Sequence, residues 1–512
     1  MEPNIGTIIQ EQPQVQYDLW KAAFGFGEHG QRSNVLPSPE ALIRARNSLP
    51  ETLAETGVGF KAIQTHILND IVPATNAGSI SPNYYGFVTG GVTPAALFAD
   101  NVVSAYDQNV QVHLPAHSIV TELEYNTLGL LADLLYLNRK DWQNGTFTTG
   151  ATASNILGLA CGREFTVRTA CERSGCPIRS VGESGLFETL QASGLSGVQV
   201  LSTLPHSSIG KAAGVLGIGR ANIKNIVCAS KGNPLSFDMD KLETELSNSN
   251  KASIVAISCG EVNTGRFATA GVDEMQAIRN LCDKYGAWLH VDGAFGIFGR
   301  VFLEDEDSSE FASIRKGCEG IELADSIAGD AHKLLNVPYD CGFFLCRRPD
   351  VAGNVFQNAN AAYLRVSGDT EGPSIPSPLN IGIENSRRFR ALPVYASLLS
   401  YGRKGYREML QRQTRLARMI SEWLFDHPAY IVLPEFENKE ALLDTTYMTV
   451  LFRAKQDELN RELTAKINTM SQMFVSGTSW QGQPACRIAI SNWRVDEKDF
   501  ALVTAVLENA AA

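Results

Sequence analysis

Two ionisable side chains in the middle of the chain have the types and order of a covalent cofactor site. Lys333 follows His332 in residues 324–342, between two turn-prone, polar stretches, and Asp292 ends the β-branched, apolar run of residues 288–292. A strand that delivers a carboxylate and a loop that delivers a lysine suit pyridoxal 5'-phosphate. The lysine amine forms a Schiff base with the aldehyde, and the carboxylate keeps the pyridine nitrogen protonated as an electron sink.

A cofactor phosphate needs an anchor, and residues 148–155 offer one. This Thr/Gly/Ser-rich turn precedes the apolar run 156–160, which resembles a helix start, and helix N-termini bind anions through free backbone N–H groups. Gly150 allows close backbone approach, while Thr149 and Thr152 supply hydroxyl groups. A simple helix cap is the alternative interpretation of the same turn.

Two more polar segments follow predicted strands. His206 comes just after residues 198–202, where an imidazole can stack on a flat cofactor and assist proton transfer; the alternative is a surface histidine. Residues 260–265 form a polar, glycine-flanked turn after residues 254–258, which suits a ring or phosphate contact but also any connection.

Asp292 and Lys333 also have ordinary alternatives. Asp292 has the type of a helix N-cap, and Lys333 that of a solvated surface lysine. The small residues Gly293 and Ala294 would let a flat ring pack beside Asp292. What favours a site is the order, because a phosphate-type turn, a histidine, a glycine-rich turn, an aspartate and a lysine each come just beyond a predicted strand.

The elements that must position these residues alternate along the chain. Strands are expected at residues 198–202, 254–258, 287–291 and 342–346, and helices at 122–136, 209–215 and 272–285. Such alternation predicts an α/β fold with a mostly parallel sheet covered on both faces, with ligands at the carboxyl ends of the strands. Residues 51–69, 395–399 and 409–424 are also expected to be helical, 485–491 to be a strand, and 355–385 to form a long loop over the site.

Composition limits the remaining possibilities. The 512 residues are 44% hydrophobic and 19% charged, as in an ordinary globular protein, and the net charge of −11 without a basic run argues against nucleic-acid or membrane partners. The ten cysteines form no Cys-x-x-Cys pair of metal type, and neither a signal peptide nor a spanning apolar run is apparent. We therefore expect reduced thiols, no metal and a cytoplasmic location.

Over roughly residues 75–495 the chain resembles the pyridoxal-phosphate-dependent group II decarboxylases, such as aromatic amino acid and glutamate decarboxylases. The most specific pieces are residues 290–294, Asp325-Ser326 with His332-Lys333, and residues 386–392. The resemblance implies a fold-type-I, aminotransferase-like large domain, a small α/β C-terminal domain and a homodimer. It suggests three segments: residues 1–100 for the dimer and substrate wall, 101–385 for the cofactor domain and 386–512 for the small domain.

The resemblance also assigns roles to individual residues. It implies that Lys333 is the Schiff-base lysine, Asp292 the pyridinium partner and His206 the residue stacked on the ring. Ala151 and Thr152 match phosphate-loop positions, His332 lies beside the lysine, and Ala294 belongs to the cofactor-binding set. Tyr363 is similar to the mobile-loop tyrosine that returns a proton to the carbanion. The chain departs from the pattern at Glu261-Val262, where many members have two threonines.

These features predict a pyridoxal-phosphate-dependent carboxy-lyase of amino acid metabolism, which converts an L-amino acid to its amine and carbon dioxide through an external aldimine and a quinonoid. An aldehyde synthase, a transaminase-like enzyme or a carbon–carbon lyase with the same cofactor is the first alternative, and a non-catalytic dimeric scaffold is the second. Tyr363 favours plain decarboxylation, since relatives with phenylalanine there tend to release aldehydes. Tyr84, Tyr85 and Phe87 are either wall or core residues, and the substrate itself stays open.

Overall fold

The computed structural model describes residues 5–25, 33–177, 180–228, 233–304, 309–358 and 375–512. The chain divides into two compact units, Met1–Gly91 with Arg415–Glu435 and Val450–Ala512, and Val92–Thr414 with Phe436–Thr449. The predicted division at residues 100 and 385 stays a prediction. The second, larger unit contains every described residue that the sequence analysis assigned to the site.

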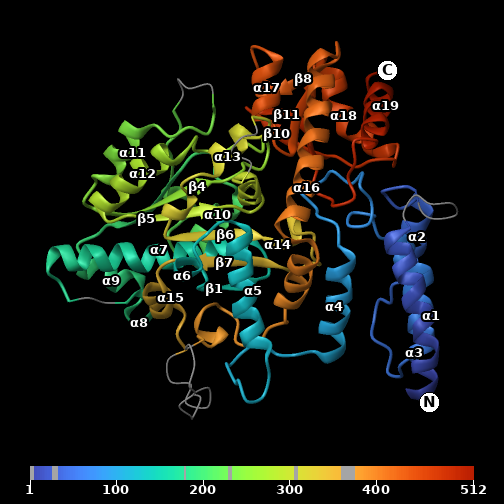
Figure 1. Ribbon diagram of the computed structural model, residues 1–512, viewed down its shortest axis with the longest axis horizontal. Helices are drawn as coiled ribbons and strands as arrows, with labels where there is room; N and C mark the ends of the chain where they lie inside the picture. Colours follow the sequence, from blue (N-terminus) through green and yellow to red (C-terminus); the bar gives the residue numbers. More distant parts are fainter. Residues whose placement is uncertain (1–4, 26–32, 178–179, 229–232, 305–308, 359–374) are drawn as a thin grey trace. The chain divides into compact units, whose positions relative to one another are not determined.

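A seven-stranded sheet forms the centre of the larger unit, in the order β1-β7-β6-β5-β4-β2-β3 (Figure 1). Strands β2 to β6 pair in parallel, whereas β7 is antiparallel to both β6 and β1. The bounds are β1 (Gly145–Thr148), β2 (Gly197–Ser202), β3 (Ile223–Asn225), β4 (Lys251–Ser258), β5 (Trp288–Asp292), β6 (Ser326–Asp330) and β7 (Gly342–Cys346). The mostly parallel α/β sheet expected from the sequence is confirmed.

The sheet is buried on both faces, and this explains which of its strands could be predicted from the sequence. Strands β4, β5 and β7 are almost entirely buried and contain continuous apolar runs, which is typical of a covered parallel sheet. Strand β6 is equally buried but consists of Ser-Ile-Ala-Gly-Asp, so its small and polar residues resemble a turn. The expectation of a turn-prone stretch before His332 was therefore wrong.

The long helix α7 (Ala151–Ser174) packs against the sheet through glycines, and Figure 1 shows it beside these strands. A Cβ atom added at Gly158 would lie 2.3 Å from His290 Cε1, and one at Gly162 would lie 2.9 Å from Trp288 Cδ1. Such distances leave no room for a side chain, so the two glycines bring the helix backbone close to β5. This close approach places the first turn of α7 beside the strand ends.

Two further helices flank the strands that carry the site. Helix α10 (Ser207–Val215) begins directly after β2, and α12 (Val272–Tyr285) has the bounds expected from the sequence. Met275, Ile278 and Cys282 form the buried stripe of α12, and Gly286, with a φ of 73°, ends the helix in the left-handed region.

The other helices of the larger unit connect and cover these elements. They are α4 (Pro94–Tyr106), α5 (Val120–Leu134), α6 (Arg139–Trp142), α8 (Val181–Ser184), α9 (Leu186–Ala192), α11 (Met239–Leu246), α13 (Ala312–Cys318), α14 (Ala331–Leu334), α15 (Pro349–Phe356) and α17 (Lys439–Thr445). Helix α16 (Ala391–Asp426) starts in this unit and is interrupted at Gly402. A buried ion pair between Arg387 and Glu124 holds the segment before α16.

The smaller unit is built around a four-stranded sheet of order β10-β11-β9-β8. Its strands are β8 (Tyr430–Leu433), β9 (Thr449–Ala454), β10 (Ser476–Trp480) and β11 (Gln483–Ala489), and its helices are α1 (Ile5–Phe24), α2 (Pro39–Ser48), α3 (Phe60–His66), α18 (Asp457–Thr469) and α19 (Asp499–Ala511). The helix expected over residues 51–69 begins only at Phe60, because Gly59, with a φ of 82°, lies outside helical geometry. No helix among the described residues is both long enough and apolar enough to cross a membrane.

Candidate functional site

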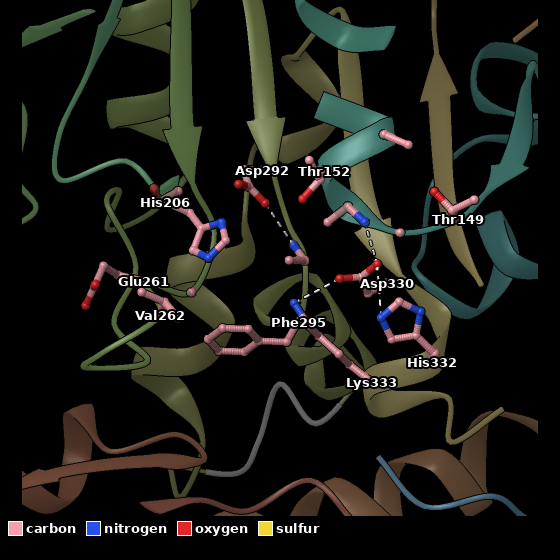
Figure 2. Close-up of a pocket in the computed structure, with 16 residues that line it drawn as sticks. Thr149, Thr152, His206, Glu261, Val262, Asp292, Phe295, Asp330, His332 and Lys333 are labelled. Atoms are coloured by element: carbon pink, nitrogen blue, oxygen red, sulfur yellow. Dashed lines mark hydrogen bonds and ion pairs between the residues drawn. The ribbon is translucent and has the colours of Figure 1, made fainter. Parts of the chain in front are cut away.

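A cavity of about 280 Å³ opens at the carboxyl ends of β4, β5 and β6, the edge where open α/β sheets bind ligands. The register pairs Ser258 with Asp292 and Asp292 with Ala328, so β4 and β5 end level with each other and β6 extends beyond them to Asp330. The lining residues, drawn in Figure 2, are Thr149, Gly150, Ala151, Thr152, Ala153, His206, Ser258, Gly260, Glu261, Val262, Asp292, Ala294, Phe295, Asp330, His332 and Lys333.

Asp292, the last residue of β5, places a buried carboxylate in the cavity wall. Its Oδ2 accepts a hydrogen bond of 2.9 Å from Asn155 Nδ2, and its Oδ1 accepts one of 3.3 Å from the backbone N–H of Ala294. The residue is 6% exposed. The two donors fix the direction in which the carboxylate points, and the exposed remainder faces the cavity.

Behind Asp292, a hydrogen-bond chain has only one consistent direction. The Asp292 carboxylate can only accept, so Asn155 turns its Nδ2 toward Asp292 and its Oδ1 toward His290 Nε2. On the other side of the ring, Ser326 Oγ accepts from Trp288 Nε1 at 2.9 Å and lies 2.8 Å from His290 Nδ1. Burial lowers the pKa of His290 to about 4, against the opposing effect of the Asp292 carboxylate. The neutral ring therefore carries its proton on Nε2 and donates to Asn155 Oδ1 at 2.9 Å.

The same chain continues from Asn155 to His206. With Oδ1 of Asn155 accepting, its Nδ2 donates both to Asp292 and to Ser208 Oγ, the latter at 2.9 Å. The Ser208 hydroxyl and backbone N–H then both donate to His206 Nδ1, at 2.7 and 3.2 Å. Because Nδ1 is an acceptor, the ring proton of His206 lies on Nε2. Asn155 thus orients the acid and the histidine together.

Lys333 lies on the short helix α14, one turn beyond the end of β6, and not on the expected loop. Its side chain is 18% exposed and its Nζ lies 2.9 Å from Asp330 Oδ2. The same Nζ is 5.9 Å from the centre of the Phe295 ring. Figure 2 shows the amine pointing into the cavity from the side of Phe295.

Asp330, the last residue of β6, makes three contacts with groups of the cavity wall, all drawn as dashed lines in Figure 2. Its Oδ1 accepts a hydrogen bond of 2.6 Å from the backbone N–H of Ala151, the first residue of α7. The same oxygen lies 3.6 Å from His332 Nε2, while Oδ2 contacts Lys333. With an exposed fraction of 3%, this carboxylate is as buried as the sheet core.

His332 closes the cavity next to Lys333. Its Nδ1 accepts a hydrogen bond of 3.2 Å from the backbone N–H of Cys341, and its ring lies 4.3 Å from that of Tyr339, centre to centre. Burial lowers the pKa of His332; the Lys333 ammonium lowers it further, and the Asp330 carboxylate opposes both effects. The neutral imidazole therefore has its proton on Nε2, the nitrogen nearest Asp330.

The connection after β4 reaches the cavity because two glycines cross there. A Cβ atom at Gly296 would lie 2.1 Å from Cys259 O, and one at Gly260, with a φ of 87°, would lie 2.8 Å from Gly296 Cα. Beyond this crossing, the carboxylate of Glu261 accepts hydrogen bonds from the N–H and hydroxyl of Thr264, at 2.8 and 2.9 Å. The crossing sets Glu261 and Val262 into the cavity wall.

The structure brings the described site residues of the sequence analysis together in this one cavity. Those residues are Lys333, Asp292, His206, Ala151, Thr152, Ala294 and His332. Tyr363 lies outside the described residues. The roles assigned to all of them stay predictions, because location in a cavity does not test a chemical role.

Three residues of the site were missed by sequence reasoning, although each carries a signal. His290 lies two residues before Asp292 and so faces the same side of the strand. Asn155 comes one helical turn after Ala151, on the same face of α7. Asp330 lies three residues before Lys333, but only the end of β6 brings it to the first turn of α7.

The aromatic residues considered for a substrate wall belong to the smaller unit. Tyr84 stacks on Phe474 with ring centres 4.6 Å apart, and Tyr85 is fully buried. Phe87 is 62% exposed. The geometry favours the core interpretation for both tyrosines.

The groups around the cavity fit pyridoxal phosphate. A primary amine, a buried carboxylate with fixed orientation, an imidazole and a helix N-terminus lie on the walls of one cavity, and these are the groups that bind the aldehyde, the pyridine nitrogen, the ring face and the phosphate. Among the described residues, no cluster of side chains could hold a metal ion.

Comparison with known proteins gives a consistent result. Residues 39–442 match the family described as the pyridoxal-dependent decarboxylase conserved domain. Tyrosine decarboxylase 2 of Arabidopsis thaliana is 26% identical over 522 aligned positions, which cover 100% of this chain and 88% of that enzyme. L-2,4-diaminobutyrate decarboxylase of Acinetobacter baumannii is also 26% identical, over 65% of this chain and 61% of that enzyme.

Solved structures agree on the fold. Tryptophan decarboxylase of Catharanthus roseus, in complex with L-tryptophan, superposes with a TM-score of 0.77 at 19% identity, covering 100% of this chain and 99% of that one. The 4-hydroxyphenylacetaldehyde synthase of Rhodiola rosea has a TM-score of 0.75 at 19% identity, with coverage of 99% and 95%. The fold-type-I architecture expected from the sequence is therefore confirmed.

Proposed function

Because the chain belongs to the family of pyridoxal-dependent decarboxylases, we propose that the cavity at the ends of β4, β5 and β6 is where this carboxy-lyase decarboxylates its L-amino acid. One observation carries the assignment. The Asp292 carboxylate, from the end of β5, and the Lys333 amine, from the helix that follows the neighbouring strand β6, line the same cavity, as the cofactor requires. Decarboxylation with pyridoxal phosphate is the activity of the family; the residue roles below are the proposal.

When bound, pyridoxal phosphate supplies a protonated pyridine ring that accepts the electron pair left on the α-carbon after carbon dioxide departs. Lys333 Nζ holds the aldehyde carbon, and Asp292 keeps a proton on the ring nitrogen. His206 covers one face of the ring and donates through Nε2, since its Nδ1 accepts from Ser208. Together, Lys333, Asp292 and His206 would hold the cofactor in one orientation and so orient the amino acid bound to it.

The remaining residues anchor the phosphate and complete the wall. Ala151 and Thr152 lie in the first turn of α7, whose N–H groups have no partners within the helix and attract an anion. His332 stands beside Lys333 with its proton on the side of Asp330. Ala294, next to Asp292, leaves space for the flat ring because its side chain is a single methyl group.

Tyr363 is proposed to return a proton to the α-carbon after carbon dioxide leaves, which makes the product an amine. Its phenol can act as a general acid, and a phenylalanine could not. The described lining contains no arginine, so a substrate with an acidic side chain has no evident partner in it. The relatives named above act on different amino acids, and an assay has to choose among them.

The assembly and location are proposals as well. We infer a homodimer, because Phe98, Tyr106 and Ile119 are 61%, 74% and 61% exposed in the larger unit, and large apolar groups are costly to leave in water. A cytoplasmic location agrees with ten cysteines that are all free thiols. Light scattering on the purified protein tests the first inference.

Carbon dioxide release should be measured across the common L-amino acids and L-2,4-diaminobutyrate, with amine, aldehyde, ammonia and peroxide quantified in the same samples. One amino acid yielding equimolar amine and carbon dioxide supports the proposal. Equimolar ammonia and peroxide with an aldehyde would instead identify an aldehyde synthase. Release of carbon dioxide from none of them, with the cofactor bound, would revive the non-catalytic scaffold.

Lys333→Ala should abolish the visible absorbance of the bound cofactor, because no other amine in the described lining can replace it. Lys284→Ala is the matched control, since that lysine pairs with Glu243 on the surface at 2.8 Å and should leave the spectrum unchanged. A Lys333→Ala protein that keeps the band would contradict the assignment of the anchor.

A further inference from the structure

The position of Asp330 has a consequence for anion binding that the proposed function does not use. Helix α7 begins at Ala151, and the N–H groups of a first turn have no partners within the helix. The Ala151 N–H is one of these, and it donates to Asp330 Oδ1 at 2.6 Å. A carboxylate therefore already satisfies the donor at the start of the helix whose N-terminus is proposed to bind the phosphate.

The same carboxylate also contacts the basic side chains of the cavity. Asp330 Oδ2 lies 2.9 Å from Lys333 Nζ, and Oδ1 lies 3.6 Å from His332 Nε2. The described lining contains three acids and one lysine, namely Glu261, Asp292, Asp330 and Lys333. A phosphate monoester is close to a dianion near pH 7, so it enters a cavity in which the one lysine of the described lining is already paired with Asp330.

Burial makes this competition strong. Asp330 is 3% exposed, so water screens its charge poorly, and a hydrogen bond between a backbone N–H and a buried carboxylate is about twice as strong as a neutral one. The negative charge of Asp330 therefore lies against the start of α7 with little screening.

We propose that Asp330 is a positioning residue that competes with the cofactor phosphate for the first turn of α7, and so weakens cofactor binding. The proposal rests on the proposed function for the identity of the cofactor. The carboxylate holds the amine and the helix start in their places, and an arriving phosphate has to displace it from Ala151. Asp330 therefore keeps Lys333 and the start of α7 aligned and lowers the affinity for the cofactor.

The test uses the full chain after removal of cofactor, titrated with inorganic phosphate and then with pyridoxal phosphate at constant ionic strength. Asp330→Asn removes the charge and keeps the shape. It should lower the Kd of inorganic phosphate by about tenfold, because a charge-assisted bond no longer has to be displaced. Protein fluorescence should show a decrease in the Kd of pyridoxal phosphate in the same direction.

Glu261→Gln is the matched control, since it removes one negative charge from the same lining but its carboxylate bonds Thr264 and not α7. We expect it to change the Kd of phosphate by less than about threefold. Equal effects of Glu261→Gln and Asp330→Asn would overturn the proposal, because general charge would then explain both. A phosphate Kd that is unchanged or higher in Asp330→Asn would also overturn it.

Asp330→Ser is the second variant in case Asp330→Asn does not fold, because a serine hydroxyl can still accept from the helix N-terminus without a charge. We expect Asp330→Ser to lower the Kd of phosphate as well, and an unchanged or higher Kd would overturn the proposal. Inorganic phosphate forms no covalent bond with Lys333, so this readout is independent of the proposed anchor. If the anchor assignment is wrong, Lys333→Ala will keep the visible band, while the phosphate comparison still decides the role of Asp330.

Discussion

Asn155→Leu offers the sharpest test of how the site is oriented. Asn155 is fully buried, and its amide donates to Asp292 and Ser208 and accepts from His290. Leucine has nearly the same size but no polar atoms, so all three partners lose a hydrogen bond together. The Asp292 carboxylate keeps its place in the sheet but loses the donor that sets its direction.

The expected magnitude follows from the kind of bond that is lost. A hydrogen bond to a charged group contributes about 1.5–3 kcal/mol, and buried polar groups left without partners cost about 1–3 kcal/mol each. If Asp292 acts through its orientation, kcat should fall by about 10- to 150-fold, since 1.36 kcal/mol corresponds to a factor of ten. The free energy of unfolding should fall by at least about 3 kcal/mol in urea titrations, because three buried groups each lose a partner.

Asn460→Leu separates the two effects. Asn460 is 8% exposed, accepts from the N–H of Ala454 at 3.2 Å and donates to Pro484 O at 2.9 Å. It belongs to the smaller unit and does not line the cavity. Its replacement should destabilise the protein without changing kcat per folded, cofactor-loaded molecule. A kcat of Asn155→Leu within about threefold of the parent would refute the orienting role.

Two other perturbations test the surroundings of His290, which lies in the hydrogen-bond network behind Asp292. Burial lowers the pKa of His290 to about 4, so between pH 6.5 and about 4 the unfolded chain binds a proton at His290 and the folded protein does not. The free energy of unfolding should therefore fall by up to about 3 kcal/mol as the pH decreases through this range. In urea titrations, His290→Gln should lack this part of the pH dependence. Gly158→Ala would place a Cβ 2.3 Å from His290 and should destabilise by about 1–3 kcal/mol, whereas Gly353→Ala, with open space around it, should stabilise by about 0.5–1 kcal/mol in thermal unfolding.

Elements with a strong pattern could be predicted from the sequence. The run 342–346 and the stripe of α12 were placed with the bounds that the structure has, because apolar period and flanking glycine agree there. Strand β6 could not be found, since Ser326, Gly329 and Asp330 are buried by their neighbours and not by their own hydrophobicity. Strand β1 was missed because its four residues include two threonines and a glycine.

For the site, the sequence indicates which residues carry chemistry but not which residues hold them. Lys333 and Asp292 stand out by type and by their place after apolar runs. Asn155 is unremarkable in the sequence, and its importance depends on α7 lying close enough to β5 for one amide to reach both Asp292 and His290. Such contacts between distant segments have no local pattern.

Residues at the strand ends form the rigid part of the site, and residues on the connections form the part that can vary. Asp292 pairs with Ser258 and Ala328, and Asp330 pairs with Gly342, so the backbone hydrogen bonds of the sheet hold both acids in place. His206 and Glu261, in contrast, lie on connections that follow β2 and β4. Sequence drift in those connections can remodel the wall that a substrate meets while the anchors stay still. A scaffold of this kind lets new substrate preferences arise without rebuilding the reaction centre.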